Sequence, residues 1–472
     1  MRRVLSVLIG TLVSISAARA AEPAAKRPPI NVLHIIADDL NIDLGCYGHP
    51  IVKTPNLDRL AARGIRFDRA FCNYPVCNPS RTSFLSGKRP ETTRVVDNHT
   101  PTRAFLKNTV MMPQLFRQNG WRTEKVGKIY HTGDAFEDPA SWDLDIRETK
   151  EAKNPPPEQI VRKGKRGGVV LDADDADTWD GKVARMSVER LERAVKDGVP
   201  FYLATGFRRP HTPYIAPRKY FELYPPEKNT WPAEPAGHVA KIPPIALTYV
   251  LGKPTLPKAD RPEVMSAYFA SVSFMDAQVG VLLDALDRLQ LWDRTVVVFH
   301  GDHGYHLGEH GGLHHKMTLF EEGTQTPLIV AAPGVKPGVS HALVELVDIY
   351  PTLADIAGLA PPGDLEGTSF QPLLNDPSRP WKSAVFAVVG REKGKLGTAG
   401  GAVYSLDYLG HTVRTDRWRY TEWPDGSAEL YDQTADPREY ANLARQPKFA
   451  STLAELKQVL KEGWKSALPK NP

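Results

Sequence analysis

Two short, almost uninterrupted apolar runs, 31–37 and 295–300, most constrain how this 472-residue chain can fold. Such a run lacks the alternation of a strand with one solvent face, so it is typical of a strand buried on both faces of a parallel sheet. Strand-like runs at 201–205 and 327–332 alternate with helical patterns at 54–63, 266–289 and 348–356. The alternation predicts an α/β fold with helices on both faces of a large, mostly parallel central sheet.

The pattern changes near residue 383, which predicts two domains. A large domain is expected at 29–382 and a smaller C-terminal α+β domain at 383–472. Within the large domain, residues 133–180 and 208–262 are rich in proline and charge with weak periodicity, and predict long surface excursions. The smaller domain is expected to contain strands at 402–408, 412–422 and 429–432 and a helix at 450–464.

The N-terminus has the pattern of a secretory signal peptide at 1–20: Arg2 and Arg3, the apolar run 4–13, and small residues before the cleavage site. The apolar run is shorter than the ~20 residues that span a bilayer, so no stable membrane anchor is expected. We expect a periplasmic or secreted protein. Cleavage removes three arginines and lowers the formal charge from +5 to +2. Without a basic region, no nucleic-acid partner is expected.

Acidic residues follow both apolar runs. Asp38 and Asp39 come directly after the first, and Asp302 and His303 after the second. In open α/β sheets, ligands bind beyond the carboxyl ends of strands. Three carboxylates near one point repel each other unless a cation neutralises them, and oxygen-rich sites suit Ca²⁺ or Mg²⁺. Alternatively, the aspartates cap a turn and His303 is a structural histidine; the matched positions after two strands favour metal binding.

The segment 77–88 contains a cysteine beside a predicted helix. Pro79 suits a first helical turn and Gly87 a C-terminal stop, so residues 79–86 are expected to be helical with Cys77 just before the N-terminus. The amide groups there favour an anion, and Arg81 adds a cation.

As plain cysteine chemistry, Cys77 could be an activated thiol, half of a disulfide or a buried apolar residue. A phosphatase-type loop would place an arginine six residues later, where Ser83 stands. A zinc site with Cys72 lacks a second ligand pair. With Cys46, the chain has three cysteines, and an odd number in an exported protein leaves at least one unpaired when pairing is intramolecular.

The motif Cys-x-Pro-Ser-Arg at 77–81, followed by Leu-Ser-Gly-Lys at 85–88, resembles the signature of type I sulfatases. The resemblance is closest to the iduronate 2-sulfatase type, which also has Asp-His at the positions of Asp302 and His303. It implies an alkaline-phosphatase-like fold, with 29–382 as the catalytic domain. The lysosomal enzyme's later cysteines are missing, which suits a bacterial relative. Further matching segments are 37–40, 44–48, 127–131, 206–211, 268–274, 301–304, 307–310, 413–420 and 429–432.

The resemblance implies that a maturation enzyme oxidises Cys77 to formylglycine and that one Ca²⁺ binds. One hydroxyl of the hydrated aldehyde attacks sulfur, and loss of a proton from the second later expels sulfate. The implied metal ligands are Asp38, Asp39, Cys77, Asp302 and His303. The implied catalytic residues are Cys77, Arg81, Lys128, His131, His211 and Lys316.

Within this set, Arg81 and Lys128 would hold the nucleophile and the developing charge. Either His211 or Lys316 would protonate the leaving sugar oxygen, and His131 would take the proton of the second hydroxyl. Taken singly, residues such as Lys128 and His211 are more commonly solvated charges or core histidines; the matched set is what favours catalytic roles.

The expected substrate is a sulfated carbohydrate that also carries a carboxylate, as a uronic acid does. Arg208 and Arg209, close to His211, would bind that carboxylate through an arginine fork; alternatively, they are solvated or paired within the protein. Two other functions stay open: a phosphodiesterase or phosphonate hydrolase of the same superfamily, and an unmodified relative that binds sulfated glycans without cleaving them.

Overall fold

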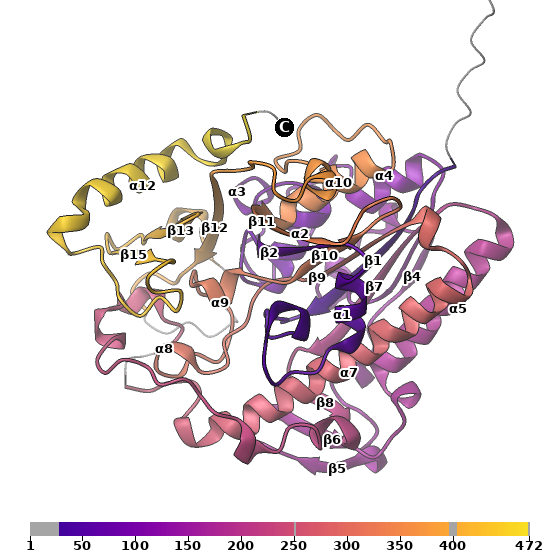
Figure 1. Ribbon diagram of the computed structural model, residues 1–472, viewed down its shortest axis with the longest axis horizontal. Coiled ribbons are helices and arrows are strands. Elements are labelled where there is room, and N and C mark those ends of the chain that lie inside the picture. Colours follow the sequence, from indigo (N-terminus) through magenta and orange to yellow (C-terminus); the bar gives the residue numbers. More distant parts are fainter. Residues whose placement is uncertain (1–27, 250–251, 396–403, 471–472) are drawn as a thin grey trace, which may run out of the picture.

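The computed structural model describes residues 28–249, 252–395 and 404–470, so the predicted signal peptide lies outside the described residues. A large sheet occupies its centre (Figure 1). The strands are β1 (Asn31–Asp38), β2 (Ile65–Phe71), β3 (Arg122–Gly127), β4 (Leu144–Ile146), β7 (Phe201–Pro210), β9 (Thr295–Gly301), β10 (Leu328–Ala331) and β11 (Gly338–Glu345). Their order is β11-β2-β10-β9-β1-β7-β3-β4, and only β10 runs antiparallel to its neighbours. The predicted α/β class with a mostly parallel sheet is confirmed.

Strand β1 is buried on both faces, as its apolar run predicts. Leu33 and Ile35 face one core and Val32 and Ile36 the other, because successive side chains of a strand point to opposite faces. All four are fully buried. The first core is covered by α1 (Pro55–Ala61), α5 (Trp179–Asp197) and α7 (Arg261–Arg288), and the second by α2 (Cys77–Ser86), α4 (Met112–Gln118) and α10 (Ile349–Ile356). Figure 1 shows the two helix layers on either side of the sheet.

Helix α7 begins five residues before the predicted start at 266. In the described part of the chain, the helical segment 258–288 alone is long and apolar enough to cross a membrane. Its most apolar stretch is 83% buried inside the protein. Residues from Val264 to Leu286 pack into the core formed with β1 and α5. The apolar character of α7 is therefore explained by its place in the core.

A second, antiparallel sheet contains β12 (Ala384–Gly390), β13 (Leu409–Thr415), β14 (Trp418–Glu422) and β15 (Ala428–Asp432), with α12 (Ala450–Glu462) beside it. The predicted strand at 429–432 and final helix are confirmed. The single strand predicted at 412–422 is wrong. Two strands form a hairpin there, and the Thr415 hydroxyl accepts a hydrogen bond from the Trp418 amide in the turn (3.0 Å).

The strand predicted at 402–408 is also wrong in its described part. Residues 402 and 403 lie outside the described residues, and Leu406–Tyr408 form a 3₁₀ turn. The Ser405 hydroxyl accepts a hydrogen bond from the Asp407 amide (3.2 Å), a local bond that competes with strand pairing.

The two predicted excursions meet in a third, small sheet. Strands β5 (Ile160–Lys163) and β6 (Gly168–Leu171) belong to the first excursion and β8 (Tyr214–Pro217) to the second. β6 and β8 pair in parallel and are buried, so this part is not a surface loop. The rest of both excursions consists largely of short 3₁₀ turns and irregular chain.

Buried charges lie where the large sheet meets the C-terminal sheet. The Arg89 guanidinium binds both carboxylate oxygens of Glu345 at 2.7 Å, and the Lys382 ammonium lies 2.7 Å from both Glu345 and Asp348. Burial favours the neutral carboxyl of Glu345, but Arg89 and Lys382 together lower its pKa to about 2. Lys382, the last residue of the predicted large domain, is bound to Glu345 of the large sheet. The domain boundary between residues 382 and 383 itself stays a prediction.

We expect Glu345→Gln to lower the free energy of unfolding by about 3–5 kcal/mol, because Arg89 would keep a buried charge without a carboxylate partner and Lys382 would keep only Asp348. Urea unfolding at pH 7 measures this. The control Asp284→Asn, which removes an exposed pair with Arg59, should cost less than about 1 kcal/mol. Because the folded pKa of Glu345 is depressed, its stabilisation is present above about pH 4.3 and is lost as the pH falls toward 2. Equal effects of the two substitutions would contradict a stabilising role for the buried Glu345 network.

Candidate active site

The two predicted acidic pairs meet at one edge of the central sheet. Strands β1 and β9 are parallel neighbours in register, with Ala37 opposite Gly301, so the residues that follow them lie side by side. The Asp39 amide donates a hydrogen bond to Asp302 Oδ1 (3.1 Å). Asp39 has φ +60, in the left-handed region that aspartate tolerates, which turns the chain away from the strand.

The side chains at this edge suit a hard divalent cation. Asp38, Asp39 and Asp302 each offer an oxygen, and these atoms lie within 4.8 Å of one another. His303 Nδ1 lies 2.8 Å from the Gly304 carbonyl, which only accepts, so a neutral ring keeps its lone pair on Nε2. That Nε2 lies 3.4 Å from Asp39 Oδ1. Three carboxylates and one imidazole nitrogen fit the oxygen-rich coordination of Ca²⁺.

Cys77 is the first residue of α2, whereas the sequence predicts it just before the helix. Val76 occupies the N-cap position, and all ten helical residues are buried. Cys77 Sγ lies 3.0 Å from Lys316 Nζ and 3.5 Å from Asp38 Oδ1. Burial, aided by Asp38, raises the pKa of this thiol to about 12. An unmodified Cys77 would therefore stay protonated, and a thiol is a poor nucleophile.

Arg81 joins the acids to α2. It lies one helical turn after Cys77, on the same face, and is fully buried. Its Nε donates to Asp302 Oδ2 (2.9 Å) and its Nη2 to Asp38 Oδ1 (3.2 Å). Its Nη1 donates to the Lys128 carbonyl (2.6 Å), just beyond β3. One guanidinium thus links the ends of three strands to the helix that carries Cys77.

Two lysines complete the charge balance. Lys128 pairs with Asp38, and Lys316 pairs with Asp39. Burial would raise the pKa of Asp38, but Lys128 and other cations hold it well below its usual range. For Asp39, burial outweighs Lys316 and raises the pKa. The carboxylates of Asp38, Asp39 and Asp302 are thus matched by three cations.

Two histidines border the cluster on its partly exposed side. His211 Nε2 lies 3.7 Å from Asp39 Oδ2, and its Nδ1 lies 2.6 Å from the Thr212 carbonyl. His131 packs edge-on against Phe136, and its Nδ1 has no hydrogen-bond partner among the described residues. Burial lowers the pKa of both rings, that of His131 to about 2 with the help of Lys128. Both are therefore neutral near pH 7.

The predicted carboxylate-binding arginines differ in their surroundings. Arg208 Nη1 pairs with Glu148 (2.8 Å), and its Nη2 lies 3.0 Å from His211 Nδ1, so it is held beside the cluster. The Arg209 guanidinium is occupied by backbone carbonyls of residues 152, 211 and 213. These bonds hold the loop after β7 and leave Arg208 as the better placed of the two.

Sequence reasoning missed two charged residues near this site. Glu148 pairs with Arg208, and the partly exposed Lys153 has its pKa lowered first by burial and then by Arg208. Lys128 lowers the pKa of Lys153 and Asp38 raises it, so the Lys153 ammonium is close enough to interact with the charges of the cluster. Both residues lie in the excursion 133–180, where no periodicity or motif distinguishes them from solvated charges.

Comparison with known proteins agrees with this geometry. A family model described as Sulfatase matches residues 30–359, and one described as N-sulphoglucosamine sulphohydrolase, C-terminal, matches residues 308–466. Human iduronate 2-sulfatase is 31% identical over an alignment covering 88% of this chain and 91% of its own length.

Solved structures share the fold. The phosphonate monoester hydrolase of Agrobacterium radiobacter has a TM-score of 0.79 at 23% identity, covering 93% of this chain and 96% of its own. A protein solved with its substrate D-glucosamine-2-N,6-O-disulfate has a TM-score of 0.74 at 23% identity, covering 94% and 99%. These likenesses show the alkaline-phosphatase-like fold alone. The Sulfatase model spans more than half of the chain, and with the human relative it shows that the chain belongs to the sulfatase family and is a sulfuric ester hydrolase.

Proposed function

We propose that this hydrolase removes sulfate from a sulfated carbohydrate, with formylglycine made from Cys77 and one bound Ca²⁺. The observation that carries the proposal is the setting of Cys77. It begins a buried helix, its sulfur lies 3.0 Å from Lys316 Nζ, and the pKa of its thiol is raised to about 12. A thiol in that state is unsuited to nucleophilic attack, whereas an oxidised side chain at the same point would face the ligand cluster.

The charge of the site supports an anionic substrate. Three carboxylates are balanced by Arg81, Lys128 and Lys316, so the cluster is close to neutral before a metal binds. A divalent cation adds two positive charges in a buried place, where they are weakly screened. The loaded site would therefore attract the sulfate group of an ester.

The residues divide between holding charge and moving protons. When bound, Ca²⁺ would polarise the sulfate group and lower the pKa of a hydroxyl on hydrated formylglycine. Arg81 and Lys128 hold Asp38 in place and present positive charge to the reacting group. His131 Nδ1 has no hydrogen-bond partner among the described residues, so we assign it the proton of the second hydroxyl; the negative charge of a bound sulfate would raise its pKa from about 2.

His211 and Lys316 both remain candidates to protonate the leaving oxygen. The Lys316 ammonium keeps its proton, because Asp39 and Cys77 outweigh burial and raise its pKa well above the usual value. His211 is neutral by comparison: its Nδ1 proton is directed at the Thr212 carbonyl, so Nε2 faces the cluster with a lone pair and must gain a proton before it can donate one. Each could therefore present a nitrogen to the substrate.

Uronate specificity is the finer part of the proposal. Arg208 lies beside His211 and is 2% exposed, and its Nε has no partner among the described residues. An arginine so placed can bind a carboxylate. The human relative acts, by its name, on iduronate 2-sulfate, which supports the same chemistry here.

Export and maturation complete the proposal. The pattern at 1–20 supports export to the periplasm or the medium, and the motif at 77–81 supports recognition by a maturation enzyme. We also propose the division into a catalytic domain, 29–382, and a smaller domain, 383–472.

Two alternatives to the proposed activity have less support. A phosphonate hydrolase activity has the support of the Agrobacterium structure, but that likeness is one of fold at 23% identity. An unmodified glycan-binding protein would not require proton-transfer groups. The presence of His131, His211 and Lys316 around Cys77 favours an enzyme.

We expect active protein to carry formylglycine at position 77, detected by peptide mass spectrometry. Cys77→Ser should give at most one slow turnover, because a serine has no second hydroxyl with which to expel sulfate. The control Cys46→Ser should keep full activity, since Cys46 lies outside the site. Fully active enzyme with an unmodified thiol at position 77 would refute this mechanism.

We expect purified enzyme to contain one Ca²⁺ per chain by elemental analysis, and Asp302→Asn to contain less. A chelator should abolish turnover and lower the melting temperature, because a ligand at 100 times its Kd adds about 2.7 kcal/mol to stability. Undiminished activity without metal would rule out the proposed role. Zinc in place of calcium would show that the ligand set was misread.

We expect a 2-sulfated uronate to be cleaved with about ten-fold or more higher kcat/KM than the same sugar with its carboxylate reduced to an alcohol, from loss of ~1.5–3 kcal/mol of charge-assisted bonding. Arg208→Gln should remove most of this difference, whereas Arg185→Gln, on α5, should keep it. Equal rates on both substrates would exclude uronate recognition and leave the sulfatase assignment intact.

A further inference from the structure

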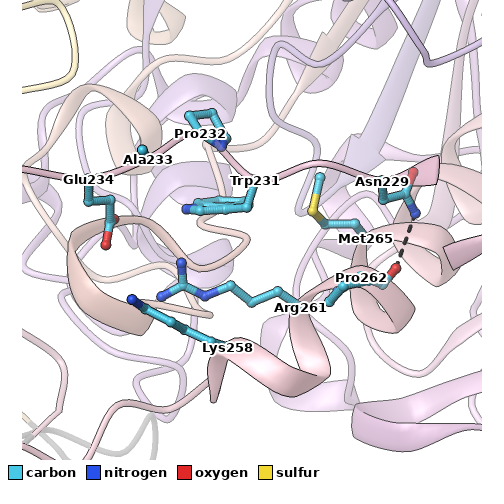
Figure 2. Close-up of a pocket in the computed structure, with 9 residues that line it drawn as sticks. All are labelled: Asn229, Trp231, Pro232, Ala233, Glu234, Lys258, Arg261, Pro262 and Met265. Atoms are coloured by element: carbon cyan, nitrogen blue, oxygen red, sulfur yellow. Dashed lines mark hydrogen bonds between the residues drawn. The ribbon is translucent and has the colours of Figure 1, made fainter. Parts of the chain in front are cut away.

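A separate cavity lies beside the N-terminal end of α7. Its volume is about 240 Å³, and none of its lining residues belongs to the catalytic cluster. Figure 2 shows Trp231 on one side and Arg261 on the other, with Lys258 and Glu234 at one end and Met265 toward the opposite end.

Arg261 is a buried cation without a counterion. Its side chain is 3% exposed, and its guanidinium makes no hydrogen bond or ion pair with any residue that the structure describes. It lies over the ring of Trp231, 5.1 Å from the ring centroid. Burying an unpaired charge is unfavourable. Buried arginines elsewhere in the described chain bind carboxylates, as Arg81 does, or backbone carbonyls, as Arg209 does. Arg261 Nε is buried without a partner, and Nη1 and Nη2 make no bond within the described chain, so the guanidinium is available to an anion in the cavity.

Other donors line the same cavity. The Trp231 indole N–H is buried and has no acceptor among the described residues. Lys258 is exposed and forms no ion pair within the described chain. The one carboxylate of the lining, Glu234, accepts hydrogen bonds from the Gly311 amide (3.1 and 3.3 Å) and makes no ion pair with Arg261. Asn229 Oδ1, also in the lining, is a buried acceptor without a partner among the described residues, so unmatched donors outnumber unmatched acceptors.

The walls and the size restrict the ligand. Trp231, Pro232, Pro262 and Met265 supply apolar surface beside the cations, a combination that suits the C–H faces of a sugar bearing an acidic group. At roughly 30 Å³ per water, the cavity has room for about eight waters, which matches one sugar unit rather than an oligosaccharide.

We propose that this cavity binds one acidic sugar unit, with the sulfate or carboxylate of that unit on Arg261 and the Trp231 N–H. The proposal rests on the proposed function for the choice of a sugar as ligand. Arg261 would pair with the oxyanion, and the apolar walls would exclude water from that pair.

Two residues that line the cavity, Arg261 and Glu234, also contact the segment that leads to Lys316. A Cβ on Gly308 would lie 3.0 Å from Arg261 Nε, so only glycine lets the guanidinium pack this closely without a shift. Glu234 holds the Gly311 amide, and the Tyr249 hydroxyl binds the His310 carbonyl. A sugar in the cavity would therefore bind to two residues that contact the segment 308–311.

Binding to the full-length enzyme tests this proposal without requiring turnover. Titration calorimetry and tryptophan fluorescence would use four probes: glucuronate, N-acetylglucosamine 6-sulfate, inorganic sulfate and neutral glucose. We expect Arg261→Gln to weaken the binding of both acidic sugars at this site by about ten-fold or more. Trp231→Phe should remove the fluorescence change, and glucose should not bind. The control Arg288→Gln, an exposed arginine at the other end of α7, should behave as wild type.

The outcomes separate the possibilities. Unchanged binding of both sugars by Arg261→Gln overturns the proposal. Inorganic sulfate that binds as tightly as the sulfated sugar overturns the assignment to a saccharide. If Arg261→Gln does not fold, Trp231→Phe is the test, because this variant keeps an aromatic ring but removes the indole N–H. Unchanged affinity of Trp231→Phe for the acidic sugars overturns the proposal, and weakened affinity supports it. Both variants should turn over a small aryl sulfate within about two-fold of the wild-type rate. A wild-type enzyme that desulfates no sugar would refute the proposed function, which is a separate outcome.

Discussion

The convergence of three buried carboxylates at the ends of β1 and β9 is the constraint on which the rest of this structure depends. Asp38, Asp39 and Asp302 could not share one place without opposite charge. Arg81 supplies part of that charge, and because it belongs to α2, neutralising the acids also sets the position of the helix. Lys128, just beyond β3, pairs with Asp38 and ties a third strand to the same point.

The position of α2 in turn sets the chemistry open to Cys77. The helix is buried along its whole length, and its first residue points into the charged cluster. The pKa of the thiol is raised by burial and by Asp38, so this site works against the thiolate that cysteine enzymes use. The same carboxylates suit a divalent cation and an oxygen nucleophile. This setting of Cys77 is what supports the proposed oxidation of that residue.

Buried charges elsewhere in the protein are of two kinds: those paired within the chain, which stabilise the fold, and those without a partner, which can bind a ligand. Glu345 forms ion pairs with both Arg89 and Lys382, so that network holds the two sheets together. Arg261 is buried to a similar degree but has an aromatic ring and a cavity where a carboxylate would be expected. A satisfied charge needs no ligand, whereas an unsatisfied one beside a cavity indicates that a partner comes from outside the chain.

The sequence by itself determined the α/β class, the two buried strands, the acids after them and the motif at 77–81, because these depend on local periodicity and on residues adjacent in the chain. It missed the hairpin within 412–422 and the turn at 406–408, where single side chains bond to the backbone. Only the tertiary structure decided that Arg209 binds carbonyls, that Glu148 pairs with Arg208, and that Arg261 has no partner among the described residues. Whether a charged side chain is solvated, paired within the protein or available to a ligand depends on contacts between segments far apart in the chain. A local sequence pattern cannot predict those contacts.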